Sequence, residues 1–295
     1  MKNQEKLAPS ELILNDDGSI YHLALKPGQI ADTIITVGDP ERVMDIAKHF
    51  DTIELEVQRR EFKTITGRYK NKRLTIVSTG IGTDNIDIVF NELDALVNID
   101  FESRTIKPMH TALTFVRIGT SGAIQSEIPI NSFLISEKAV GFDNLLHFYS
   151  NTDFLDIPFS EALKEHAQWS KQKSDPYVVC GDTQLIKHFS TNDFVKGITA
   201  TNVGFYAPQG RKLRLELQDN NLNHKLQMFT YKQQKITNLE METSGIYGLS
   251  MLLGHRAISL NAILANRANG TFSDSPKKAV NLLIVRTLEK LALMQ

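Results

Sequence analysis

Residues 33–42, TIITVGDPER, decide the fold class. The β-branched and apolar run Thr33–Val37 predicts a buried strand. Gly38 permits a tight turn after that strand, and Pro40 suits the first position of a helix. We therefore expect a strand, a turn and a helix that carries Arg42 in its first turn. Exposed N–H groups at a helix N-terminus bind anions, and an arginine beside them adds to that attraction.

Two further strands run into turns of small residues, STGIG at residues 78–82 and RIGTSG at residues 117–122. Arg117 is expected to point outward near the end of its strand. Thr120 offers a hydroxyl and a backbone N–H in the turn that follows. Ligands of open α/β sheets collect outside the carboxyl ends of the strands, so these turns predict a binding site. Neither turn matches a Walker loop or a complete Rossmann fingerprint, which argues against ATP and NAD.

Short apolar runs alternate with longer segments of helical period along the chain, which predicts an α/β fold and one domain over residues 1–295. Asp84 is the expected N-cap of a helix whose apolar stripe starts at Ile86. Two polar, aperiodic stretches, Asn98–Ala112 and Phe148–Phe159, are expected to be surface connections. The other expected strands are Leu74–Ser78, Thr114–Ile118, Phe133–Ile135, Tyr177–Cys180 and Ala257–Leu264. The expected helices are Glu41–His49, Asn85–Val97, Glu161–Lys171, Ser244–Leu253 and Lys277–Leu293.

The composition excludes several classes of protein. Lys and Arg number 33 against 34 Asp and Glu, so the net charge of −1 gives no global attraction to nucleic acid or to an acidic membrane. The start of the chain, MKNQEKLAPSE, has no apolar leader segment, and no apolar stretch is long enough to cross a bilayer. The single cysteine, Cys180, cannot form an internal disulfide. We interpret it as a small buried apolar residue of a cytoplasmic protein.

Five motifs together resemble the nucleoside phosphorylase superfamily, which includes uridine phosphorylase and the trimeric or hexameric purine enzymes, with uridine phosphorylase the nearest branch. The resemblance implies a three-layer αβα domain with a mixed, partly barrel-like central sheet. It also implies phosphorolysis, in which phosphate attacks the anomeric carbon and releases the base and a sugar 1-phosphate. No cofactor is implied, since inorganic phosphate is a co-substrate, and no metal ligand is predicted. The motifs are Gly38–Arg42, Arg60–Phe62, Ser78–Gly82, Arg117–Gln125 and Glu240–Thr243.

The resemblance also assigns site residues position by position. Guanidinium groups pair with phosphate oxygens through parallel hydrogen bonds, and a carboxylate can accept from the 2′ and 3′ hydroxyls of ribose. The implied catalytic residues are Arg117, Thr120, Glu242 and Arg211. The implied phosphate ligands are Gly38, Arg42, Arg117, Thr120 and, from a neighbouring subunit, Arg60. The implied ribose ligands are Met241, Glu242 and, from the neighbour, His22.

The segment GFYAPQGR, residues 204–211, resembles the uracil-binding segment of uridine phosphorylases. A glutamine amide such as that of Gln209 can accept from uracil N3–H and donate to a carbonyl of the ring, while Arg211 donates to O4. Phe205 can stack on the base. Arg267, which follows the strand Ala257–Leu264, completes the implied base-binding set.

Several alternatives remain open from the residues. Purine enzymes place an acidic residue after a late strand, and residues 265–267 are Ala-Asn-Arg, which favours pyrimidines. A hydrolase would not need Arg42, Arg60 and Arg117. Loss of Glu242 or of a phosphate arginine would indicate a non-catalytic nucleoside-binding protein, and all of them are present. Leu239 replaces an aromatic residue that is common before the Glu-Met-Glu triplet, so ribose and deoxyribose are not distinguished. Gly204 and Pro208 differ from the commoner uracil-binding pattern, so thymidine stays open beside uridine. We expect a homodimer with shared active sites, with assembly into a hexamer as the alternative.

Overall fold

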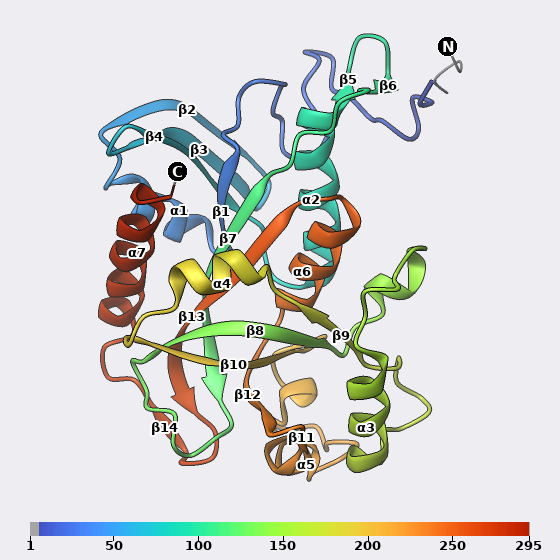
Figure 1. Ribbon diagram of the computed structural model, residues 1–295, viewed down its shortest axis with the longest axis vertical. Helices are drawn as coiled ribbons and strands as arrows, with labels where there is room; N and C mark the ends of the chain where they lie inside the picture. Colours follow the sequence, from blue (N-terminus) through green and yellow to red (C-terminus); the bar gives the residue numbers. More distant parts are fainter. Residues whose placement is uncertain (1–5, 295) are drawn as a thin grey trace.

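The strand predicted over residues 33–37 forms as β1 (Thr33–Val37) in the interior of one large mixed sheet (Figure 1). The computed structural model describes residues 6–294 of the chain. Two parallel neighbours flank β1, namely β4 (Lys72–Ser78) and β7 (Thr114–Ala123). Every residue of β1 is buried, as expected for a parallel strand covered on both faces.

One half of the sheet closes on itself. From β7 the strands follow the order β7-β13-β8-β10-β12, and β12 pairs back with β7 through Asn238 opposite Ala123 and Leu239 opposite Gly122. The other half continues as an open sheet through β1, β4, β3 and β2. The predicted mixed, partly barrel-like sheet is therefore confirmed. Besides β1, β4 and β7, the strands named in this order have the bounds β2 (Thr52–Arg59), β3 (Phe62–Tyr69), β8 (Phe133–Gly141), β10 (Phe194–Thr201), β12 (Gln234–Glu240) and β13 (Arg256–Asn266).

Helices cover both faces of the large sheet, which completes the three layers. Ile35 of β1 packs in the apolar cluster beneath α1 (Pro40–Ala47) and α7 (Pro276–Ala292). Ile34 points to the opposite cluster, which contains residues of α2 (Thr83–Asn98) and α6 (Thr243–Leu252). Because successive side chains of a strand point to opposite faces, β1 contributes to two separate apolar cores.

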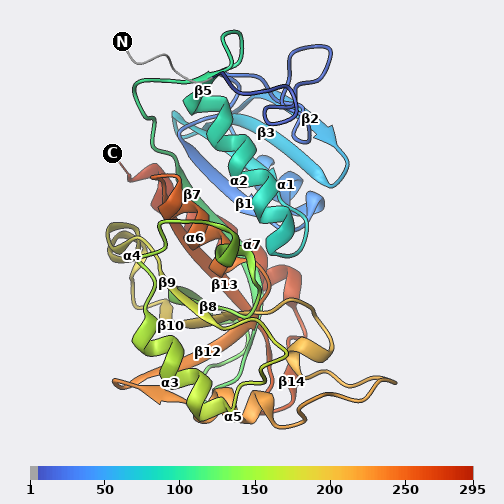
Figure 2. The ribbon, with the colours of Figure 1, turned by 90° about the vertical axis from the view of Figure 1, so that its right-hand side faces the viewer.

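The closed half carries its own smaller helices. Contacts join α3 (Ile157–Ala167) to α5 (Leu222–Met228), and Figures 1 and 2 show these helices side by side at one end of the molecule. The shorter elements are β5 (Ile99–Asp100), β6 (Thr105–Ile106), β9 (Tyr177–Cys180), β11 (Thr230–Tyr231), β14 (Thr271–Phe272), α4 (Thr183–Phe189) and the 3-10 turns η1 (Leu145–Phe148) and η2 (Ala207–Gln209).

The longer strands β2, β3, β10 and β12 are not among the strands expected from the sequence, although the signal for β2 is present. Its sequence TIELEVQR alternates apolar and polar residues, which is typical of a strand with one solvated face. The turn between β3 and β4 is Lys70–Asn71, and both residues have positive φ, of 47° and 68°. That conformation matches the right-handed twist of a two-residue hairpin.

One expected turn is wrong. Residues 119–122 were expected to leave the sheet after Ile118, but β7 continues to Ala123. The continuation is stabilised on both sides, because β7 pairs with β13 as far as Ala123 and with β12 at Gly122 and Ala123. A local pattern of glycines and hydroxyl residues could not reveal these two partners.

Three smaller expectations also need correction. Helix α2 begins at Thr83 after Gly82, which has a φ of 99°, so Asp84 lies in the first turn and is not the N-cap. Cys180 is exposed because it is the last residue of the short strand β9, so it is not a buried apolar residue. Helix α3 occupies residues 157–167, about four residues before the expected range Glu161–Lys171.

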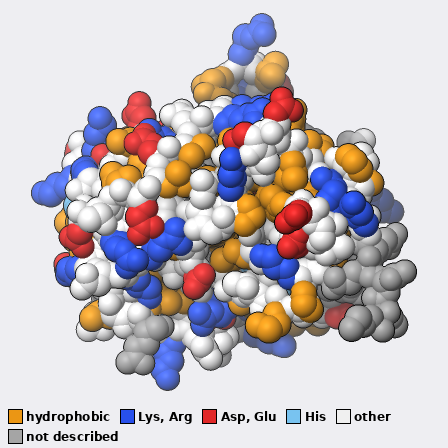
Figure 3. Space-filling model, turned by 90° about the horizontal axis from the view of Figure 1, so that it is seen from above, with side chains coloured by type: hydrophobic (Ala, Val, Ile, Leu, Met, Phe, Trp, Pro, Cys, Tyr) orange, Lys and Arg blue, Asp and Glu red, His pale blue; other side chains and the backbone are white. Residues whose placement is uncertain are grey.

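The outer surface agrees with the balanced composition. Basic and acidic side chains are interspersed on the face shown in Figure 3. Among residues 6–294, no helix combines the length and the apolar character that a bilayer crossing requires. Of the N-terminal stretch in which no leader was expected, residues 1–5 lie outside the described part of the chain.

Candidate functional site

A pocket with a volume of about 830 Å³ opens where β1, β4 and β12 end. We call it the strand-end pocket. It brings together residues as far apart in the chain as Gly38 and Phe272. The predicted site residues that line it are Gly38, Arg42, Arg117, Thr120, Phe205, Gln209, Arg211, Met241 and Glu242, whereas His22, Arg60 and Arg267 are not among its lining residues.

The turn after β1 forms one corner of the pocket, as the sequence predicted. Asp39 caps α1 by accepting a hydrogen bond from the backbone N–H of Glu41 at 2.9 Å, and Pro40 begins the helix. Gly38 lies close to β4, because a Cβ on it would be 3.3 Å from the carbonyl oxygen of Gly80. This corner therefore presents a helix N-terminus next to Arg42.

Arg42 reaches across this corner and donates to the carbonyl oxygen of Ile118 at 3.4 Å. Burial lowers the pKa of Arg42, and the charge of Arg117 lowers it further. A guanidinium nevertheless remains charged at neutral pH because its unperturbed pKa is so high. Two positive side chains thus share a partly enclosed space, which is a favourable setting for an anion.

Arg117 lies at the centre of the site and is only 6% exposed. Its Nη2 atom is 2.6 Å from Oε2 of Glu242 and 3.0 Å from Oε2 of Glu240, and its Nη1 donates to Asn261 at 2.9 Å. Burial by itself lowers the pKa of Arg117, but the two carboxylates more than offset this and raise it. The expectation that Arg117 points outward from a strand end is therefore wrong, because it points into the pocket from the middle of β7.

Glu242 is the N-cap residue of α6 and is almost fully buried. One carboxylate oxygen binds Arg117, and the other accepts from the backbone N–H of Gly82 at 3.0 Å. Burial raises the pKa of Glu242, Arg117 opposes that rise, and Glu240 adds to it, with a raised pKa as the result. The ionised carboxylate accepts hydrogen bonds through both oxygens, whereas the protonated form carries an O–H donor on one of them, so the two forms present different groups to a ligand.

Segment 204–211 forms the opposite wall of the strand-end pocket. Gln209 is 3% exposed, and its side-chain oxygen accepts from Arg211 at 2.6 Å. The guanidinium carbon of Arg211 lies 3.8 Å from the centre of the Phe205 ring, so one face of that ring is already covered. Burial lowers the pKa of Arg211 to about 10, with a further contribution from Arg267, and the side chain stays charged at neutral pH.

Arg267 holds this segment in place from the end of β13. Its guanidinium donates to the backbone carbonyl oxygens of Gln209 at 3.1 Å and Gly210 at 3.3 Å. These bonds support the loop and do not point into the pocket, so a direct contact of Arg267 with a base stays a prediction. Leu239, the residue that departs from the common pattern, lines the pocket and is buried.

His22 and Arg60 lie together on another part of the same chain. The His22 ring contacts Tyr21 at 4.7 Å between centroids, and the Arg60 guanidinium lies 5.8 Å from the same tyrosine ring. Glu92 orients His22 by accepting from Nδ1 at 2.7 Å and from the backbone N–H of His22. The predicted role of these residues in a neighbouring subunit's site stays a prediction.

Three residues that support the site were not predicted as site residues. Glu240 accepts hydrogen bonds from Thr201 Oγ1 and from the backbone N–H groups of Glu242 and Thr243, which fixes its carboxylate beside Arg117. Asn261 and Ser259 of β13 hold the other side of Arg117. The signal for this pair was two polar residues at alternate positions within an otherwise apolar strand.

A cluster elsewhere has the composition of a metal site but not its chemistry. Asp94, His110 and His255 bring possible ligand atoms within 4.8 Å of one another. However, Nδ1 of His255 accepts from the backbone N–H of Leu113 at 3.1 Å, so the proton of the neutral ring lies on Nε2, which faces Asp94 at 3.2 Å. Metal binding through Nε2 would require loss of that proton as well, which leaves an imidazolate. The approach to Asp94 is a close charge contact and not a hydrogen bond, since Nε2 of His255 has no hydrogen-bond partner in the described part of the chain.

The chain was compared with known proteins. A sequence model described as the phosphorylase superfamily matches residues 32–291. The uridine phosphorylase of Thermococcus kodakarensis is 30% identical in an alignment that covers 98% of this chain and 92% of the relative. The uridine phosphorylase of Haemophilus influenzae is 27% identical, with 90% of this chain and 96% of the relative covered.

Among solved structures, the chain resembles a nucleoside phosphorylase of Trypanosoma brucei that is described as showing uridine phosphorylase activity. The TM-score is 0.84 at 27% sequence identity, and the match covers 96% of this chain and 99% of the other.

Proposed function

This chain belongs to the phosphorylase superfamily, and from that premise we propose that it cleaves uridine with inorganic phosphate to uracil and ribose 1-phosphate. It is then a pentosyltransferase, that is, a glycosyltransferase of the uridine phosphorylase type. The observation that carries the proposal is the strand-end pocket, in which two arginines, a buried carboxylate and the Gln209–Arg211 pair face one space. The relatives support the same reaction, since those named above carry uridine phosphorylase names.

In the proposed reaction, phosphate binds between the N-terminus of α1 and Arg117, with Arg42, Gly38 and Thr120 as its other contacts. An oxygen of phosphate forms a bond to C1′ of the ribose while the bond from C1′ to N1 of uracil breaks. The bonding electrons leave with the base. Arginine–phosphate hydrogen bonds orient the nucleophile, and the bound anion stabilises the positive charge that develops on the sugar.

Glu242 and Met241 are the proposed ribose contacts. Glu242 is paired with Arg117 at 2.6 Å, so ribose would compete with Arg117 for this carboxylate, and phosphate would compete with Glu242 for the guanidinium. Because Arg117 also contacts Glu240 and Asn261, its position is kept when Glu242 turns to the sugar.

Base recognition is the proposed role of Phe205, Gln209 and Arg211. Gln209 and Arg211 form a hydrogen-bonded pair, so the amide of one and the guanidinium of the other lie side by side. Such an edge matches the N3–H donor of uracil and its adjacent carbonyl acceptors. Negative charge develops on those carbonyl oxygens as the base leaves, so the same donors favour the transition state.

We propose that the functional unit is a homodimer in which each chain lends His22 and Arg60 to the other's pocket, with a hexamer of such dimers as the alternative. Both residues lie outside the strand-end pocket of their own chain. A two-fold axis would return the same two residues to both sites. The proposed setting is pyrimidine salvage in the cytoplasm, in agreement with the single, unpaired cysteine.

The deciding experiment is a panel of nucleosides incubated with the purified protein with and without phosphate, with release of free base as the readout. We expect cleavage of uridine that depends on phosphate, and poor cleavage of inosine and adenosine. Equal or faster cleavage of inosine would identify a purine enzyme. Cleavage without phosphate would identify a hydrolase, and uridine binding without any cleavage would identify a binding protein. Deoxyuridine and thymidine in the same panel define the sugar and base preference.

A further inference from the structure

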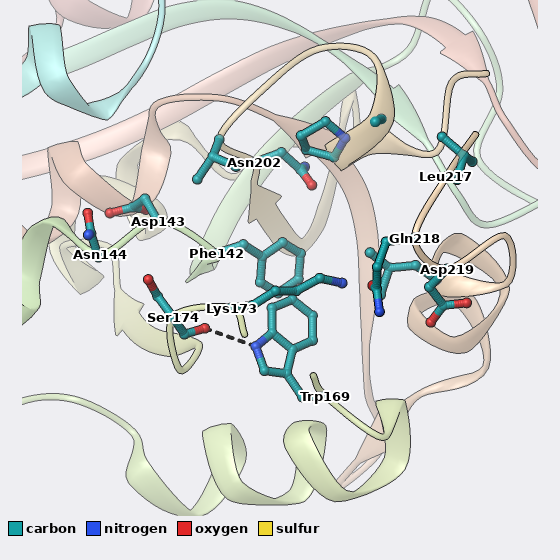
Figure 4. Close-up of a pocket in the computed structure, with 14 residues that line it drawn as sticks. Phe142, Asp143, Asn144, Trp169, Lys173, Ser174, Asn202, Leu217, Gln218 and Asp219 are labelled. Atoms are coloured by element: carbon teal, nitrogen blue, oxygen red, sulfur yellow. Dashed lines mark hydrogen bonds between the residues drawn. The ribbon is translucent and has the colours of Figure 1, made fainter. Parts of the chain in front are cut away.

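A second pocket, with a volume of about 390 Å³, lies on the other side of the segment that carries Phe205 and Gln209. We call it the rear pocket (Figure 4). Val203, Ala207 and Pro208 line it, whereas Phe205, Gln209 and Arg211 line the strand-end pocket. Segment 203–211 is therefore the wall between the two pockets. The volume lies in the range of small-molecule sites.

Aromatic rings form one side of the rear pocket. Phe142 and Trp169 pack with 4.8 Å between ring centroids and their planes tilted by 34°, and Figure 4 shows the two rings next to each other. The amino group of Lys173 lies 4.9 Å from the centre of the Trp169 ring. Among residues 6–294, Lys173 forms no salt bridge, so its ammonium has no carboxylate partner besides this contact with the Trp169 ring. Flat rings pack well on such a surface.

The inner end of the pocket holds an unused acceptor. Asn202 is 2% exposed, and its Nδ2 donates to the backbone carbonyl oxygens of Ala200 and Glu240. These bonds fix the orientation of the amide, and in the described part of the chain its Oδ1 has no hydrogen-bond partner. A buried acceptor without a donor is unfavourable by about 1–3 kcal/mol. Oδ1 is itself fully buried, so a ligand N–H has to displace a neighbouring group to reach it, and it would then remove that penalty.

The carboxylates at the pocket are already occupied. Asp143 accepts from the hydroxyl groups of Tyr177 and Ser244, and Asp219 at the rim pairs with Lys225 at 2.9 Å. The pocket thus offers a free positive donor and a free neutral acceptor beside an aromatic wall. That combination disfavours cations and suits a flat, uncharged ring that carries both a carbonyl group and an N–H.

We propose that the rear pocket is a second binding site for a planar cyclic amide of the nucleobase type, separate from the strand-end pocket. The ring packs against Phe142 and Trp169, a carbonyl oxygen accepts from Lys173, and a ring N–H donates to Asn202. Because Ala207 and Pro208 touch this ligand while Gln209 faces the strand-end pocket, occupancy of the rear pocket changes the affinity of the strand-end pocket for its base. Such coupling acts equally in both directions.

Trp169 is the only tryptophan of the chain, so its fluorescence reports on the rear pocket. The experiment titrates the full-length protein with uracil, hypoxanthine and dihydrouracil and follows the emission of Trp169. Dihydrouracil keeps the polar groups of uracil but loses the planar aromatic ring, which makes it a matched control ligand. We expect a saturable change with uracil or hypoxanthine and weaker binding of dihydrouracil. No saturable change with either planar base would overturn the proposal, as would equal binding of dihydrouracil.

Three variants test whether the change in Trp169 fluorescence comes from binding in the rear pocket. Lys173→Met keeps the aliphatic stem but removes the charged donor, so binding should weaken about tenfold. Lys171→Met, at an exposed lysine two residues away, is the control and should titrate like the wild type. Gln209→Leu damages the proposed base contact in the strand-end pocket and should leave the titration in place. A titration lost in Gln209→Leu but kept in Lys173→Met would show that Trp169 reports on the strand-end pocket, and the proposal would fail.

The proposed coupling between the rear pocket and the strand-end pocket rests on the proposed function, so it needs a test of its own. The fluorescence titration does not depend on any activity. Uracil should inhibit uridine cleavage in two ways, by competition at the strand-end pocket and by a second component that reaches a limit once the rear pocket is full. The second component should disappear in Lys173→Met and remain in Lys171→Met. A protein that binds uracil at Trp169 but cleaves no nucleoside would keep the second site and lose only the proposed function. Purely competitive inhibition in both variants and the wild type would overturn the coupling.

Discussion

A Cβ atom on Gly119 would lie 1.8 Å from Nη1 of Arg117. The guanidinium therefore crosses directly over Gly119 to reach Glu240, Glu242 and Asn261. Gly119→Ala must displace it and leave buried charges without partners. We expect the free energy of unfolding to fall by about 2–4 kcal/mol and phosphorolysis to be largely lost. Chemical denaturation and steady-state kinetics measure the two effects.

A double-mutant cycle separates this clash from other effects of Gly119→Ala. In an Arg117→Ala background no guanidinium remains to be displaced, so the added alanine should have little further effect on activity or stability. Additive losses in the double variant would show that Gly119 acts independently of Arg117.

Arg117→Ala itself should reduce kcat/KM by an amount equivalent to about 2–4 kcal/mol of transition-state stabilisation. It removes a contact to phosphate and leaves Glu240 and Glu242 facing each other without a positive charge. Arg256→Ala is a matched control, because Arg256 is an exposed arginine at the start of β13. A decrease of less than about threefold would mean that Arg117 is not in the phosphate site.

Gln209→Leu should reduce uridine cleavage steeply while the KM for phosphate changes little. The substitution keeps the size of a side chain that is 3% exposed, but it leaves Arg211 and the bound base without the amide partner. Gln172→Leu, at an exposed position, should behave like the wild type. A parallel rise in the KM for phosphate would show that segment 204–211 contributes to the phosphate site, and its assignment to the base would then be wrong.

The raised pKa of Glu242 predicts a pH dependence. Burial and Glu240 disfavour the ionised form, so activity that needs this carboxylate should rise with pH through a value above the ordinary 4.3 or so of glutamate. Glu240→Gln removes one negative charge, lowers the pKa of Glu242 and should move the acid limb of kcat/KM to lower pH. Glu216→Gln, at an exposed position, should leave the limb in place. An acid limb unmoved by Glu240→Gln would show that Glu242 is not the titrating group. Phosphate titrates equally in all variants and cannot cause a difference between them.

Subunit complementation tests the shared site. Arg60→Ala and Arg42→Ala should each be nearly inactive, but mixing them under conditions of subunit exchange should restore about a quarter of wild-type activity. In a mixed dimer both lesions fall in one site, and the other site is intact. Arg42→Ala mixed with Arg117→Ala is the control and should stay inactive, because each chain then damages its own pocket. No recovery despite demonstrated exchange would mean that Arg60 serves its own chain.

Local sequence was sufficient where neighbouring residues determine the geometry. Gly38, Asp39 and Pro40 form the predicted turn and helix start because a flexible residue, a capping carboxylate and a fixed φ act over adjacent positions. The motifs named as a resemblance also pointed to most residues of the strand-end pocket. Neither kind of signal needed knowledge of which strands pair.

Only the tertiary structure decided how Arg117 is used. Its partner Glu242 is 125 positions away, and the strand that carries Arg117 continues past the expected turn because β13 and β12 pair with it. The ion pairs with Glu240 and Glu242, the need for Gly119 and the raised pKa of Glu242 all follow from that closure. The sequence by itself determined which chemical groups the chain carries and how each turn begins. Which groups meet, and how strongly burial and neighbouring charge shift their pKa values, depended on long-range strand pairing that no local pattern records.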